Sequence, residues 1–193
     1  MKKGESLLFA LLFILGACNN AGKDSVEKAD SVNQAKLDSS SVNTPPPTIA
    51  TDEESSSFLV RAANGGMEEM QLGEIARQKA VNRKVKDFGA MMVKDHSAEN
   101  DFVKALAVRR NVTLPTTVGD QEKEEINNLN KKSGVAFDRA YMKNMIRNYT
   151  KKINLFENAS DKVKDVEVKT FIDNALPQLR NYLDSAKAIQ KGL

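Results

Sequence analysis

The stretch VKDFGAMMVKDHSAENDFVKAL, residues 85–106, decides the fold of this chain, because its core-type side chains recur every three or four residues. That spacing puts them on one face of an α-helix, which turns once in about 3.6 residues. The face consists of Val85, Phe88, Met92, His96, Glu99, Val103 and Leu106. We therefore predict a long amphipathic helix over about residues 82–111, which ends near Asn111 and Pro115.

Three other segments show the same helical spacing. They are residues 55–79, 135–163 and 165–190, and a short polar helix is expected over about 119–132. Ser55, Ser56 and Ser57 are suitable N-caps for the first of these helices. Pro177 should remove one backbone hydrogen bond from the last helix and kink it. The sequence predicts an all-α, up-and-down four-helix bundle over residues 55–191, with the short helix between the second and third long helices.

Composition supports this fold class. Aromatic residues make up only 6% of the chain, and Gly and Pro mostly lie outside the periodic segments, which favours helices over a β-sandwich. The exception is Gly65-Gly66 inside the first long helix, where each glycine weakens the helix by about 1 kcal/mol. We expect that close packing against a neighbouring helix explains this pair.

The N-terminus has the three parts of a bacterial lipoprotein signal. Lys2 and Lys3 precede the apolar run SLLFALLFILGA, residues 6–17, which is shorter than the roughly 20 residues that span a bilayer. The sequence Leu-Gly-Ala-Cys at residues 15–18 resembles the lipobox that lipoprotein signal peptidase recognises. The resemblance implies that residues 1–17 are removed and that Cys18 is diacylated, so that its acyl chains bind the membrane. The alternative is an ordinary secretory signal with an incidental cysteine.

A polar segment follows the lipobox. Residues 19–54 are rich in Ser, Asn, Asp, Lys and Thr and contain three consecutive prolines, residues 45–47. Such a segment cannot bury enough apolar surface to offset its chain entropy. We therefore expect residues 18–54 to be a lipidated cysteine and a disordered tether that holds the bundle off the membrane. Asn19 is not the Asp that signals inner-membrane retention in some bacteria, which favours the outer membrane.

Several function classes are excluded by residue content. Cys18 is the only cysteine and His96 the only histidine, and no Gly-x-Ser-x-Gly motif or phosphate-binding glycine loop is present. The net charge is +3, and the basic residues alternate with acidic ones instead of forming a basic block for nucleic acid. The sequence predicts a protein that is not an enzyme and does not bind nucleic acid.

Five polar side chains nevertheless fall where the helical faces require apolar ones. They are Glu69, His96, Glu99, Tyr149 and Tyr182. A buried carboxylate or imidazole is costly unless it is paired or bound to a metal. Di-iron bundle proteins place Glu and Glu-x-x-His ligands in their cores, but the order here is His96-x-x-Glu99. We predict a hydrogen-bonded layer in which His96 contacts Glu69, without a cofactor; the alternative is a site for iron or another transition metal.

Several motifs together resemble domain-of-unknown-function family 4142, whose members are described as predicted outer-membrane proteins with a ferritin-like bundle. The matching segments are residues 62–69 (AANGGMEE), 72–73 (LG), 92–97 (MVKDHS), 114–115 (LP), 137–141 (FDRAY), 156–157 (FE) and 176–179 (LPQL). The resemblance extends from Phe58 to about Ala188 and implies a ferritin-like four-helix architecture in the cell envelope, with no agreed reaction. Family members commonly carry histidines where this chain has residues 147–149 (RNY) and Tyr182, so a redox function is less expected here.

These observations favour a lipid-anchored helical module that binds an envelope protein partner or supports stress tolerance. The alternative is a ferritin-like metal-binding or redox protein that uses the five polar residues. Direct membrane binding by the helices is a weaker hypothesis, because their polar faces mix Lys with Glu and Asp.

Overall fold

The computed structural model describes residues 22, 24–40 and 51–193. Over these residues it forms six helices and no strand, which confirms the all-α prediction. The helices are α1 (Ser25–Ser40), α2 (Glu53–Lys79), α3 (Arg83–Arg109), α4 (Asp120–Asn130), α5 (Gly134–Ser160) and α6 (Val166–Lys191). The predicted signal peptide, residues 1–17, and Cys18 lie outside the described residues. In the described part of the chain, no helix is both long and apolar enough to cross a membrane.

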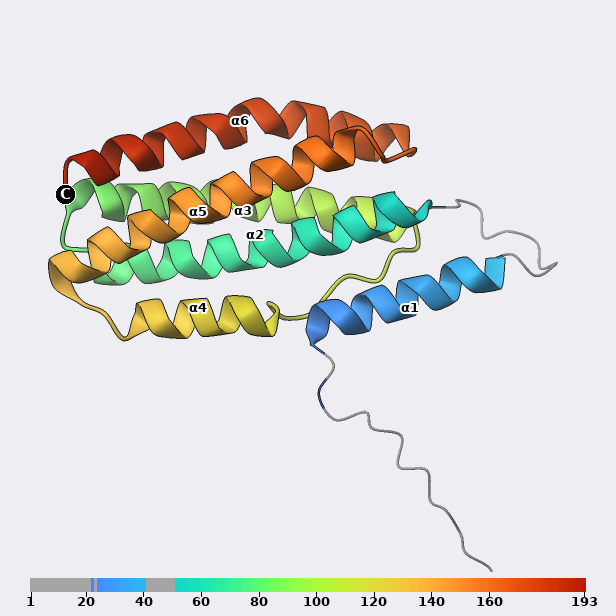
Figure 1. Ribbon diagram of the computed structural model, residues 1–193, viewed down its shortest axis with the longest axis horizontal. Coiled ribbons are helices and arrows are strands. Elements are labelled where there is room, and N and C mark those ends of the chain that lie inside the picture. The colour runs from blue at the N-terminus through green and yellow to red at the C-terminus, as the bar shows by residue number, and fades with distance from the viewer. Residues whose placement is uncertain (1–21, 23, 41–50) are drawn as a thin grey trace, which may run out of the picture.

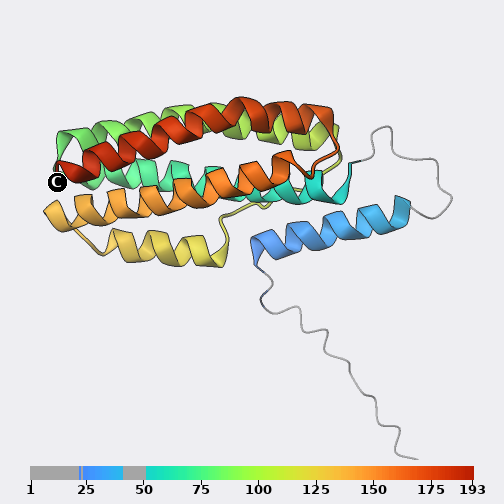
Figure 2. The same ribbon diagram turned by 45° about the horizontal axis from the view of Figure 1, so that its top comes forward.

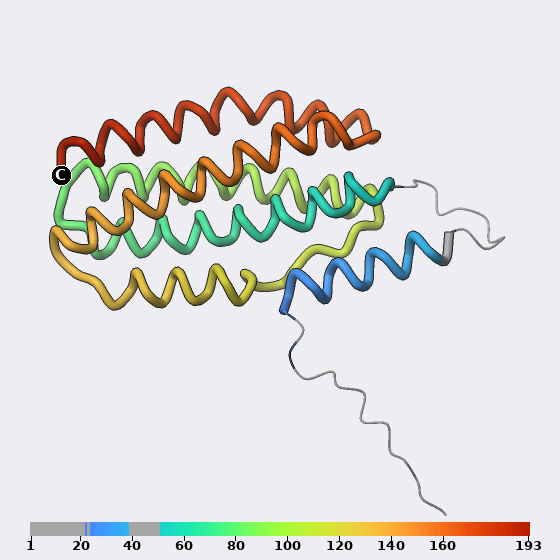
Figure 3. The backbone as a smooth tube through the Cα atoms, in the orientation of Figure 1, coloured from blue at the N-terminus to red at the C-terminus, as the bar shows by residue number. Residues whose placement is uncertain are grey.

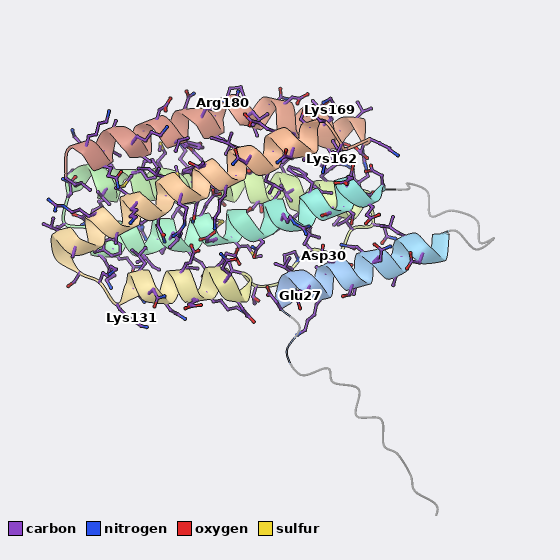
Figure 4. The ribbon with its side chains drawn as sticks, viewed as in Figure 1. Glu27, Asp30, Lys131, Lys162, Lys169 and Arg180 are labelled. Atoms are coloured by element: carbon purple, nitrogen blue, oxygen red, sulfur yellow. The ribbon has the colours of Figure 1, made fainter. Side chains whose placement is uncertain are left out.

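The helices are arranged in three layers (Figure 1). Helices α2–α3 and α5–α6 form two antiparallel hairpins, and α3 and α5 run in the same direction because α4 carries the chain back between them. The strict up-and-down order that the sequence predicted is therefore wrong at this connection. The α3–α6 layer packs on the α2–α5 layer, and α1 and α4 lie end to end on the other side of α2 and α5 (Figure 2). Charged side chains lie on the outside, such as Arg180 and Lys169 on α6 (Figure 4).

Side-chain caps set the starts of three of the long helices, α2, α3 and α6. The Asp52 carboxylate accepts a hydrogen bond from the Ser55 backbone N–H at 3.0 Å, so α2 begins at Glu53. Ser55 and Ser56 are therefore buried inside the helix, and the prediction that they cap it is wrong. Asp precedes the serines and its carboxylate satisfies the free N–H groups of the first turn. Asn82 and Asp165 cap α3 and α6 in the same way.

Glycines allow α2 and α3 to approach each other closely. A Cβ atom on Gly73 would lie 2.8 Å from the Gly89 carbonyl oxygen, and one on Gly66 would lie 1.9 Å from Oδ1 of Asn100. Close packing thus explains Gly66. It does not explain Gly65, because a Cβ atom there would meet no atom within 4 Å.

The last helix continues through its proline. α6 runs from Val166 to Lys191 with Pro177 inside it, and Figure 3 shows it as an unbroken but bowed tube. Pro177 is exposed on the outer side of the bundle. Its ring therefore bends the helix toward the core without ending it.

Helix α1 contradicts the predicted disorder of the tether over residues 25–40. The Asn33 side chain donates to the Thr113 carbonyl at 2.8 Å and accepts from the Thr113 N–H at 2.7 Å. The Lys36 ammonium donates to the Asn111 carbonyl at 2.8 Å, and Ala29 is only 3% exposed. The prediction was wrong because it considered only apolar burial. Polar side chains of α1 instead satisfy backbone groups of the loop after α3, which a composition argument cannot detect.

Candidate functional site

The five predicted polar residues come together in the centre of the bundle, in a layer across all four long helices. Glu69 comes from α2, His96 and Glu99 from successive turns of α3, Tyr149 from α5 and Tyr182 from α6. His96 is completely buried. The 3.6-residue period that makes each helix amphipathic turns all five side chains inward, as the sequence predicted.

His96 connects two carboxylates to a tyrosine. Its Nδ1 lies 2.8 Å from Oε2 of Glu99 and 3.3 Å from Oε2 of Glu69, and its Nε2 lies 2.8 Å from the Tyr149 hydroxyl. The contact between His96 and Glu69 was predicted and is confirmed. Because a carboxylate only accepts hydrogen bonds, Nδ1 is the nitrogen that carries a proton and donates.

A lysine that sequence analysis missed lies between the two carboxylates. The Lys152 ammonium is 2.7 Å from Oε2 of Glu69 and 3.0 Å from Oε1 of Glu99, and the residue is 7% exposed. Burial by itself lowers the pKa of Lys152, but attraction to Glu69 and Glu99 outweighs it and raises this pKa above its ordinary value. Burial raises the pKa of Glu99, yet Lys152 and His96 together bring it down to about 2. The layer therefore contains an internal ion pair of Lys152 with Glu69 and Glu99.

The two tyrosines are held as neutral phenols. Burial raises the pKa of Tyr149 well above its ordinary value, and burial together with a hydrogen bond to Asp95 raises the pKa of Tyr182 to about 12. The Tyr182 hydroxyl donates to Oδ2 of Asp95 at 2.7 Å, so it faces away from the histidine. Its ring still packs in the layer, with its centroid 5.8 Å from that of His96 and 5.5 Å from that of Tyr149.

This donor set does not fit a transition metal. The position between Glu69 and Glu99, where a bound cation would bridge two carboxylates, is filled by the Lys152 ammonium. Both phenols are hydrogen-bonded within the protein, Tyr149 to His96 and Tyr182 to Asp95. Among the described residues, no group of three or more His, Cys, Asp or Glu side chains has the arrangement needed to hold a metal ion.

A cavity of about 250 Å³ opens on one side of the layer, where α4 covers α2 and α5. Glu69 and Lys152 line the cavity as well as the layer. Glu68 also lines it and is 7% exposed. Burial, followed by repulsion from Glu69, Glu125 and Glu122, raises the pKa of Glu68 to about 8. A strongly shifted carboxyl group in a cavity is a recognised mark of a functional site.

Comparison with known proteins supports the motif analysis. Residues 40–189 match the family described as Domain of unknown function (DUF4142). The chain belongs to this family. The match includes every residue of the polar layer and of the cavity, and the family description assigns no activity.

The architecture of this DUF4142 member is similar to that of a solved structure titled crystal structure of DUF305 fragment from Deinococcus radiodurans. The TM-score is 0.67 at 12% identity, over 75% of this chain and 99% of the other. At this identity the likeness shows the fold alone. A comparison with curated proteins found no match.

Two functional candidates of this DUF4142 domain were missed by sequence reasoning, namely Lys152 and Glu68. Both sit at the edges of their apolar faces, where lysine and glutamate are normally solvated. A signal was present for Lys152, because it follows Tyr149 by three residues and therefore lies one turn along the same face of α5. Glu68 gave no such signal, since its burial depends on how α4 and α5 pack around this part of α2.

Proposed function

We propose that the protein is a lipid-anchored helical bundle of the bacterial cell envelope, at the outer membrane, that serves as a non-enzymatic interaction or stress-related module. We also infer a ferritin-like topology for the bundle, which the two antiparallel hairpins α2–α3 and α5–α6 and the long connection through α4 support. The observation that carries the non-enzymatic assignment is the ion pair of Lys152 with Glu69 and Glu99.

That ion pair leaves the layer without a free reactive group. The ammonium satisfies both carboxylates, and His96 is fully engaged between Glu99 and Tyr149. A buried, internally paired polar layer defines how helices align, since any shift of one helix would leave charges unpaired in the core. The layer therefore favours a single alignment of the helices. We expect binding partners to contact the outside of the bundle.

Lipid anchoring follows from the sequence around Cys18, and α1 sets its geometry. Six residues lie between Cys18 and the start of α1 at Ser25, and the chain from Cys18 to Ser25 can span at most about 25 Å. Because α1 packs on the bundle, the domain would be held close to the bilayer, not at the end of a long spacer. An acylated cysteine in this position would orient the α1 side of the bundle toward the lipid.

Anchoring is tested by growing cells that express the full chain or its Cys18→Ala variant with an alkyne-labelled fatty acid. We expect label and membrane fractionation for the wild-type chain and neither for the variant. A labelled Cys18→Ala chain, or an unlabelled wild-type chain, would contradict lipidation.

The non-enzymatic role of the layer is tested by elemental analysis of the full chain purified in detergent without chelator. We expect no stoichiometric iron, manganese, zinc or copper. About one or two metal ions per chain, lost in His96→Ala, would instead assign the protein to the ferritin-like metal-binding or redox class.

A further inference from the structure

The cavity between α2, α4 and α5 contains a carboxylate, Glu68, that forms no ion pair with any described residue. Glu68 accepts a hydrogen bond from Asn148 Nδ2 at 2.8 Å, and this bond is the one influence that favours its charged form. Burial and three nearby carboxylates all oppose that form. None of the described cations that line the cavity pairs with Glu68: Lys152 pairs with Glu69 and Glu99, and Arg61 pairs with Asp30. Lys151 is exposed and forms no ion pair within the described residues.

The shape of the cavity suits a small molecule. Its volume of about 250 Å³ lies just below the range of drug-sized pockets. Gly65 lines it, and a Cβ atom there would meet open space, so the cavity extends to the backbone of α2. Leu155 and Phe156 of α5 form an apolar wall beside Glu68. A buried carboxylate without an ion pair, next to apolar side chains, is an arrangement that recognises an amphipathic cation.

We propose that this cavity binds a small organic ammonium ion, whose charged nitrogen pairs with Glu68 and whose short apolar chain packs against Leu155 and Phe156. A metal ion fits less well, because the apolar wall offers no ligands and the described residues hold no cluster of three or more metal-ligating side chains of suitable arrangement. The proposal does not depend on lipid anchoring or on the role of the polar layer.

Binding should strengthen as the pH rises toward 8, because Glu68 must lose its proton to pair with the cation. The other charged groups that line the cavity are Arg61 and Glu69 on α2, Glu122 and Glu125 on α4, and Lys151 and Lys152 on α5. The raised pKa of Glu68 supports this dependence, since burial and the neighbouring carboxylates hold the proton on it until about pH 8.

The test is calorimetric titration of the full chain in detergent at pH 8 with n-butylammonium, and with n-butanol as its uncharged counterpart. Glu68→Gln removes the charge while its amide oxygen can still accept from Asn148. Glu124→Gln makes the same charge change on α4 at an exposed position outside the cavity. Gly65→Leu fills the cavity from a position where the added Cβ meets no atom.

We expect saturable butylammonium binding by the wild-type chain and by Glu124→Gln. It should be weakened at least about tenfold in Glu68→Gln and in Gly65→Leu. Equal binding of butanol, unchanged affinity in Glu68→Gln, or no binding at about 10 mM amine would each overturn the proposal. Calcium that binds in place of the amine, and depends on Glu68, would also overturn it.

Discussion

The substitution Glu68→Gln should stabilise the protein at alkaline pH and leave it almost unchanged at acidic pH. The pKa of Glu68 rises from 4.5 to about 8 in the fold, mainly through burial and then through Glu69, Glu125 and Glu122. Because each pH unit corresponds to about 1.4 kcal/mol, ionisation of Glu68 in the folded protein costs up to about 5 kcal/mol. Local relaxation and water entry reduce this, so we expect about 2–5 kcal/mol.

The sign follows from the direction of the shift. A carboxyl group with a raised pKa binds its proton more tightly in the folded state. Its stabilising contribution is complete below pH 4.5 and is lost as the pH rises through 8. A glutamine resembles protonated Glu68 and retains the Asn148 hydrogen bond, but it cannot ionise. The gain in the variant should therefore appear between pH 5 and pH 9.

The measurement is the free energy of unfolding from urea titrations of the wild-type chain, Glu68→Gln and Glu124→Gln at pH 5, 7 and 9. Subtraction of the wild-type value at each pH cancels other titrating groups, and Glu124→Gln controls for the change in net charge. A Glu68→Gln gain that is the same at pH 5 and pH 9, within about 0.5 kcal/mol, would refute the reasoning. So would a wild-type protein whose advantage over the variant grows with pH.

Three further predictions concern the core and α1. Lys152→Met should lower the free energy of unfolding at pH 7 by about 3–5 kcal/mol in urea titrations, because two carboxylates lose their buried partner. The control Lys151→Met, at an exposed position, should change it by less than about 0.5 kcal/mol. Similar losses in both variants would contradict the ion pair. Tyr141→Phe should not destabilise the protein and should raise its melting temperature, because the buried Tyr141 hydroxyl has no hydrogen-bond partner among the described residues; a clear loss would show that the hydroxyl is satisfied. Asn33→Ala should speed proteolytic cleavage in α1 while the bundle melts as before, and unchanged cleavage would show that the Asn33 hydrogen bonds do not hold the helix.

The family and the all-α fold were predictable because they depend on local patterns. The apolar repeat around Phe88 and Met92 determines a helix whatever surrounds it, and two such helices joined by a short loop pack as an antiparallel hairpin. The meeting of Glu69, His96 and Tyr149 was predictable for the same reason. Each lies on the inward face of its helix, and inward faces in a bundle share one core.

The sequence alone determined which side chains point inward, because helical periodicity is a property of a single segment. Only the tertiary structure decided what those side chains meet. Lys152 reaches Glu69 and Glu99 because α5 packs beside α2 at one particular height. Glu68 is buried because α4 and α5 pack around it. Helix α1 is ordered because Asn33 forms hydrogen bonds with the backbone of Thr113, 80 residues away. Such contacts depend on the relative positions of separate helices, which no local pattern records.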